Sequence, residues 1–190
     1  FDDWELVAVD DCSPDDTLAV LRRYHDPRIR VIAAEQNGGP VIARNLAFAH
    51  AQGRYIAALD QDDIALPTRF EQQAAYLDTH PETVLVSSAV DVLEQGRVVA
   101  GTWPRPLSPV MIDWMLRIRN PFAWSSVMFR ADAARRLDPF ERPEVRYAED
   151  FDLYHRLRAF GPFAQIEVPL TLYRNHDGGV SKTAQDRMLA

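Results

Sequence analysis

Two short apolar runs that end in acidic residues place the strongest constraint on the fold of this chain. The run 6–9 stops at Asp10 and Asp11, and the run 55–59 stops at Asp60. Runs this short and apolar are typical of buried strands in an α/β sheet. In such a sheet, ligands bind beyond the carboxyl ends of the strands. The sequence therefore predicts one crevice lined by carboxylates and suited to a divalent metal with an anionic ligand.

Composition narrows the class of protein. The chain has 190 residues, of which 47% are hydrophobic, enough for one domain with a sizeable core. Its net charge is −7 and no basic block exceeds two residues, which argues against a nucleic-acid partner. Cys12 is the only cysteine, so no disulfide can form within the chain. No apolar run approaches the roughly 20 residues that span a bilayer.

Strand-like and helix-like segments alternate along the chain. Strands are expected at 5–10, 30–33, 55–59, 83–93, 98–102, 125–129 and 163–173, and helices at about 40–51, from Pro67, near 110–118 and at 150–160. This alternation predicts an α/β fold with a mostly parallel, Rossmann-like sheet flanked by helices. We expect a single domain over 1–190, with a nucleotide-binding half at 1–102 and an acceptor half at 103–190.

The segment after the second acidic strand carries three carboxylates. Because alternate residues of an extended chain point the same way, Asp60 and Asp62 can face one site while Asp63 faces another. Carboxylates together with diphosphate oxygens suit Mg²⁺ or Mn²⁺. The alternative is a solvated turn that caps a helix ahead of Pro67.

Two further segments could contact a nucleotide. Asp11, at the end of the first strand, could accept a hydrogen bond from a nucleobase ring N–H, or could merely cap a helix. Arg44 follows Asn37-Gly38-Gly39 at one turn into a helix, where it could bind phosphate in a bidentate manner. The alternative for Arg44 is a surface position.

Two residues in the second half could act in catalysis. Asp150 lies at a helix start, where it could serve as a general base that deprotonates a hydroxyl, or as an N-cap. His176, near the C-terminus, could bind a metal or lie free on the surface.

Five segments in this order resemble family 2 of the glycosyltransferases, which are inverting, nucleotide-sugar-dependent enzymes with the GT-A fold. The segments are FDDWELVAVDDCSPDDT, NGGPVIARNLAFAHAQGRYIAALDQDDI, NPFAWSSVMFR, AEDFDLYHRL and PLTLYRNHDGGVS. The resemblance implies a donor, with UDP-sugars favoured, and a saccharide or lipid-linked saccharide acceptor in polysaccharide biosynthesis. It also implies Mn²⁺ or Mg²⁺ as cofactor. The implied location is cytoplasmic, and the resemblance leaves open whether the acceptor brings the protein to the inner face of the membrane.

The resemblance also implies roles for single residues. The implied roles are donor binding for Asp11, Arg44 and Asp60, metal binding for Asp62 of a DxD-type motif and for His176, catalysis as general base for Asp150, and a place on the acceptor side for Trp124, Ser125, Ser126 and Glu149.

The chain departs from the family pattern in two places. Family members have an apolar strand and a helix upstream of the segment that matches Phe1, and that strand is central in the sheet. We therefore expect an incomplete GT-A-like domain. Cys12 also replaces a glycine that is common at its turn.

Two other functions fit part of the chain. A response-regulator receiver domain also has acids after its first and third strands, but it needs a lysine after a later strand, and the only lysine here is Lys182. A truncated, non-catalytic nucleotide-sugar-binding module is the other alternative. The oligomeric state is not predicted.

Overall fold

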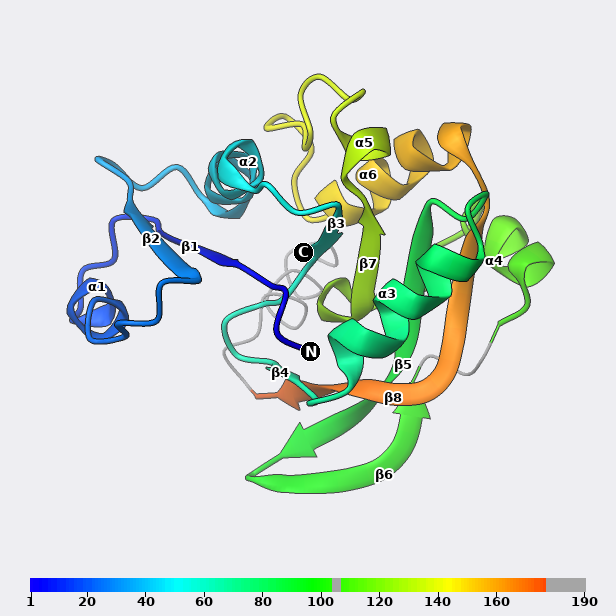
Figure 1. Cartoon of the computed structure of the whole chain (residues 1–190), viewed down its shortest axis with the longest axis horizontal. Coiled ribbons are helices and arrows are strands. Elements are labelled where there is room, and N and C mark those ends of the chain that lie inside the picture. Colours follow the sequence, from blue (N-terminus) through cyan, green and yellow to red (C-terminus); the bar gives the residue numbers. More distant parts are fainter. Residues whose placement is uncertain (104–106, 177–190) are drawn as a thin grey trace, which may run out of the picture.

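The strands form two separate sheets in the computed structural model, which describes residues 1–103 and 107–176 (Figure 1). The strands are β1 (Leu6–Asp10), β2 (Ile29–Ala33), β3 (Tyr55–Ala57), β4 (Ile64–Ala65), β5 (Leu85–Glu94), β6 (Arg97–Trp103), β7 (Val127–Arg130) and β8 (Phe163–Asn175). β1 and β2 pair in parallel as a small sheet. The other six form one sheet in the order β3-β7-β5-β8-β4, with β6 paired to β5.

Helices connect and cover these strands. They are α1 (Thr17–Leu21), α2 (Pro40–His50), α3 (Arg69–Thr79), α4 (Pro109–Met115), α5 (Ala131–Ala134) and α6 (Glu149–Leu157), with the 3₁₀ turns η1 (Trp124–Ser126) and η2 (Arg158–Phe160). Within the described residues, no helix is both long and apolar enough to cross a bilayer.

The α/β fold agrees with the sequence, but the expectation of a mostly parallel sheet is wrong. Within the large sheet only β5 and β8 run parallel, whereas β3–β7, β5–β7, β4–β8 and β5–β6 are antiparallel. One reason lies at Gln95 and Gly96, whose φ angles of 46° and 78° make a two-residue hairpin turn that reverses the chain. Alternation of strands and helices could not reveal the pairing direction of distant strands.

Side-chain alternation along the strands builds a core on each face of the large sheet. One face, lined by Leu85, Phe129 and Phe163, packs with Ile112 of α4, Ala133 of α5 and Leu153 of α6. The opposite face, lined by Val86, Met128 and Ala164, packs with Ala74 and Leu77 of α3. Since successive strand residues point to opposite faces, each of these strands supplies both cores. The sheet is thus a layer between α3 and the helices α4–α6 (Figure 1).

The small sheet is not hydrogen-bonded to the large one. In the described part of the chain β1 pairs only with β2, and β3 pairs only with β7. Leu6, in a run that is typical of a buried strand, is 42% exposed. Among the described residues, one edge of β1 and one edge of β3 are therefore unpaired.

Candidate active site

The acidic turn after β3 is held by segments far away in the sequence. The backbone N–H of Asp60 donates to Ser125 Oγ at 2.9 Å, just before β7. At the end of β8, the backbone N–H of Arg174 donates to Asp63 Oδ1 at 2.8 Å, and Arg174 Nε donates to the Asp62 carbonyl oxygen at 2.7 Å. Asp63 thus faces β8.

Asp62 meets His176 beside this turn. Asp62 Oδ2 lies 2.9 Å from His176 Nε2, and their side chains are 38% and 41% exposed. The two predicted metal ligands are therefore brought together at the surface. No group of three or more His, Cys, Asp or Glu side chains suited to a metal occurs among the described residues. A cation here would take its remaining ligands from a bound substrate and from water.

Negative charge accumulates around Asp60. The pKa of the Asp60 carboxyl is raised to about 6, mainly by burial; Arg44 opposes the rise, and the carboxylates of Asp63, Asp62 and Asp150 contribute to it. Asp150 is therefore close enough to the acidic turn for the charges to interact. The sequence-predicted Asp60, Asp62 and Asp150 thus share one region of surplus negative charge.

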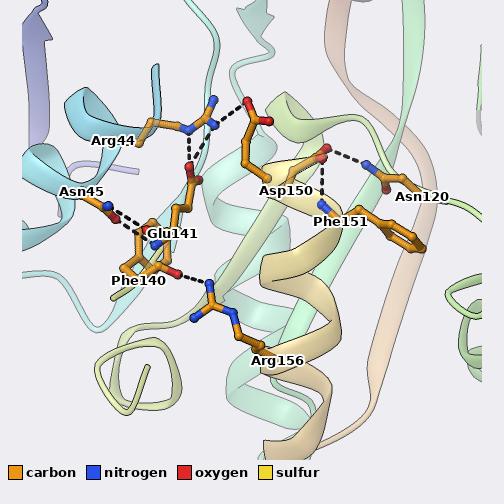
Figure 2. Close-up of polar contacts among 9 residues, drawn as sticks. Arg44, Asn45, Asn120, Phe140, Glu141, Asp150, Phe151 and Arg156 are labelled. Carbon is orange, nitrogen blue, oxygen red and sulfur yellow. Dashed lines mark hydrogen bonds and ion pairs between the residues drawn. The ribbon is translucent and has the colours of Figure 1, made fainter. Parts of the chain in front are cut away.

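Asp150 is the second residue of α6 and is not its N-cap, a position held by Ala148. Its Oδ2 accepts from Asn120 Nδ2 at 2.5 Å and its Oδ1 accepts from the Phe151 backbone N–H at 2.7 Å (Figure 2). Burial is the largest cause of a raised pKa for Asp150, and the Phe151 and Asn120 hydrogen bonds oppose it. The carboxylate is oriented from both oxygens, and its raised pKa makes it a stronger base.

Arg44 of α2 is held by two glutamates. Its Nε and Nη2 both lie 2.9 Å from Glu141 Oε2, and Nη2 lies 3.1 Å from Glu149 Oε1 (Figure 2). The guanidinium also lies over the ring of Trp124, at 5.0 Å from its centroid. Burial by itself lowers the pKa of Arg44, but the two carboxylates outweigh it and the net pKa is raised. In this structure Arg44 connects α2, the Glu141 loop, η1 and α6; its donor-binding role stays a prediction.

Asp11 is engaged by the glycine loop that follows β2. Its two carboxylate oxygens accept the backbone N–H groups of Gly38 and Gly39 at 2.9 and 2.7 Å, and Asn37 Nδ2 donates to its carbonyl oxygen. These bonds explain how the loop is folded back over β1. Contact of Asp11 with a nucleobase stays a prediction. At Cys12, φ is 57°, a left-handed conformation that favours the glycine expected there.

The three predicted acceptor-side residues of η1 have different environments. Ser125 and Ser126 are 1% and 0% exposed, and the Ser126 hydroxyl donates to the Ala123 carbonyl oxygen. Trp124 is partly buried and lies between Arg44 and Tyr154. Ser125 therefore holds the acidic turn through the Asp60 amide, Ser126 holds the loop through Ala123, and Trp124 borders Arg44.

Three contact residues were not found from the sequence: Asn45, Asn120 and Glu141. Asn120 precedes a proline, a pattern that favours a turn and gives no sign of the contact with Asp150. Asn45 and Glu141 bind each other through main-chain and side-chain groups 96 residues apart. No local pattern could reveal that contact.

Comparison with known proteins identifies the family. Residues 1–137 match the model described as Glycosyl transferase family 2. The putative glycosyltransferase EpsE of Bacillus subtilis is 32% identical over 92% of this chain, which covers 63% of EpsE. The glucosyltransferase WfaP of Escherichia coli, named as acting on an α-D-GlcNAc-diphosphoundecaprenol, is 31% identical over 93% of this chain and 68% of its own length. The chain thus spans about two thirds of these relatives.

The fold agrees with solved glycosyltransferase structures of the GT-A type. Staphylococcus aureus TarS 1–349 in complex with UDP-GlcNAc superposes with a TM-score of 0.71 at 22% identity, covering 92% of this chain and 50% of the TarS chain. The receiver-domain alternative does not fit, because β3 pairs with β7 and not with β1. Lys182 lies outside the described residues. By its matched segments and its fold, the chain belongs to glycosyl transferase family 2.

Proposed function

We propose that this chain transfers a sugar from a nucleoside-diphosphate sugar to an acceptor hydroxyl with inversion, using Asp150 as general base. The observation that carries the proposal is the oriented Asp150 carboxylate, which lies within charge-interaction range of the acidic turn at Asp60. The UDP-GlcNAc complex of TarS and the UDP-Glc named for WfaP support a UDP-sugar donor.

The reaction needs one base and a stabilised leaving group. Asp150 takes the proton of the acceptor hydroxyl, the acceptor oxygen bonds to the anomeric carbon, and the bond from that carbon to the diphosphate oxygen breaks. Attack from the face opposite the leaving diphosphate inverts the anomeric configuration. A second catalytic carboxylate is not required, unlike in most glycosidases.

The Asp62–His176 pair would hold Mg²⁺ or Mn²⁺ at the donor diphosphate. The Asp62 carboxylate is the kind of hard oxygen ligand that these cations prefer, and the His176 imidazole beside it would approach the cation or the diphosphate. The metal would supply neutralisation of the charge that develops on the diphosphate. A lipid-linked acceptor, as named for WfaP, would bring the protein to the inner face of the membrane.

The test is a UDP-release assay with UDP-sugars and a saccharide or lipid-linked acceptor, with Mn²⁺ or with a chelator. Asp150→Asn should lower kcat by about 10²–10⁴-fold and leave donor affinity unchanged, whereas Asp62→Asn should weaken donor binding only when Mn²⁺ is present. Asp132→Asn is the matched control, because Asp132 is an exposed acid in the first turn of α5. Full turnover by Asp150→Asn would rule out its role as base. Normal donor binding without turnover by the wild-type chain would favour a non-catalytic binding module.

A further inference from the structure

Glu141 has no role in the proposed chemistry, yet it is among the most completely enclosed charged groups of the described structure. It is 0% exposed and lies in the irregular segment between α5 and α6. Burying a carboxylate is costly unless partners compensate it. Its Oε2 accepts from Arg44, whereas its Oε1 is buried without a hydrogen-bond partner. Such an arrangement calls for a structural or functional reason.

The backbone of Glu141 is fixed to α2. Asn45 Nδ2 donates to the Glu141 carbonyl oxygen, and the Glu141 N–H donates to Asn45 Oδ1, both at 2.8 Å (Figure 2). Arg44 is the neighbour of Asn45 on the same helix. Asn45 therefore binds the main chain of Glu141, and its neighbour Arg44 binds the side chain. The Glu141 carboxylate is thus held in place where it can orient the Arg44 guanidinium.

The start of α6 has no side-chain N-cap, so contacts from outside the helix must hold it in place. Its N-cap, Ala148, has no side chain that can bond to the helix, and the seven residues before Glu149 form no helix or strand. The first turn is held instead through side chains. Glu149 binds Arg44, and Asp150 binds Asn120. The position of Asp150 therefore depends on the neighbouring Glu149, and Glu149 depends on the guanidinium that Glu141 fixes.

We propose that Glu141 is a positioning residue for Asp150, acting through Arg44 and Glu149 to set where the first turn of α6 lies. This inference rests on the proposed function, in which Asp150 is the base. It assigns Arg44 to the alignment of the base in place of a direct contact with the donor. The alignment requires an acceptor atom on residue 141, because Oε2 is the atom that contacts both Nε and Nη2 of Arg44.

The test compares Glu141→Leu, which removes the acceptor, with Glu141→Gln, which keeps one. Misplacing a reacting group by about 1 Å can cost on the order of 100-fold in rate. Glu141→Leu should therefore lower kcat by about 10- to 100-fold without changing donor KM, and Glu141→Gln should restore most of the wild-type kcat. Glu144→Leu, an exposed glutamate of the same loop, is the matched control and should behave as wild type.

Amide hydrogen exchange at residues 148–153 supplies a readout that is independent of turnover. Exchange there should be faster in Glu141→Leu and unchanged in Glu141→Gln and Glu144→Leu. A raised donor KM with normal kcat in Glu141→Leu would overturn the proposal in favour of donor binding by Arg44. Unchanged exchange would also overturn it. If Asp150→Asn keeps full turnover, the proposed base fails, and exchange alone then decides whether Glu141 positions α6.

Discussion

Single residues in the candidate site are governed by an excess of carboxylates over cations. Glu141 and Glu149 share the one guanidinium of Arg44, and Asp60 and Asp150 lie within range of the same charges. The pKa of the Glu141 carboxyl is raised to about 7, mainly by burial; Arg44 opposes the rise, and Glu149 and Asp150 contribute to it. Near neutral pH the Glu141 carboxyl therefore changes its protonation state, and a glutamine at position 141 is a close mimic of the protonated side chain.

This shift predicts a pH-dependent stability. Because the folded pKa of Glu141 lies above its ordinary value of 4.5, the native state binds the proton more tightly than the unfolded state. The free energy of unfolding of the wild type, relative to Glu141→Gln, should fall by about 3 kcal/mol as pH rises from 4.5 to 7, and should level off above that. Urea titrations of both proteins at several pH values check this. A difference that rises with pH would contradict the shift.

At the scale of elements, α3 fixes the strand ends from which the site emerges. Arg69, the first residue of α3, is 0% exposed, and its Nη2 donates to the carbonyl oxygens of Ala58 and Val127 at 2.8 and 3.1 Å. Ala58 precedes the acidic turn by two residues, and Val127 follows Ser126. One guanidinium thus connects the helix to both segments that hold Asp60.

Removal of this connection should destabilise the whole domain. Arg69→Ala deletes a buried side chain and its hydrogen bonds to Ala58, Val127 and Gln73, so we expect a loss of about 3–5 kcal/mol in the free energy of unfolding. Arg54→Ala, which breaks an exposed ion pair with Asp78, should cost less than about 1 kcal/mol. Denaturant unfolding of both variants measures the contrast, and equal losses would show that Arg69 is not a structural anchor.

At the scale of the molecule, the two sheets differ in how well they are enclosed. In residues 1–40 only Asp10 is buried, whereas Leu85, Val86, Ala89 and Val90 of β5 are 0% exposed. The small sheet is tied to the rest mainly through α2 and a few polar contacts, such as Glu5 with the Gln52 and Gly53 amides. It therefore has little buried apolar surface of its own to stabilise it.

This difference predicts two levels of protection from hydrogen exchange. Amides of β1 and β2 should exchange through local opening at a lower free energy than amides of β5 and β8, which should approach the free energy of global unfolding. Native-state exchange followed by mass spectrometry can resolve the two regions. Equal protection in both sheets would mean that the small sheet unfolds only together with the large one.

The division of the domain into a donor half at 1–102 and an acceptor half at 103–190 stays a prediction, and residues 104–106 and 177–190 lie outside the described part of the chain.

The sequence by itself determined the features that neighbouring residues encode. Short apolar runs located β1 and β3, and the helix expected at about 40–51 corresponds to α2, because apolar periodicity acts over a few residues.

Only the tertiary structure decided which distant segments meet. Strand direction in the large sheet, the 114-residue approach of His176 to Asp62 and the burial of Glu141 against Arg44 all depend on long-range packing. A lone glutamate in an irregular loop looks the same in the sequence whether it faces water or a guanidinium. Its role is set by Arg44 and Asn45 of α2, which lie 97 and 96 residues away in the sequence and contact it only in the folded chain.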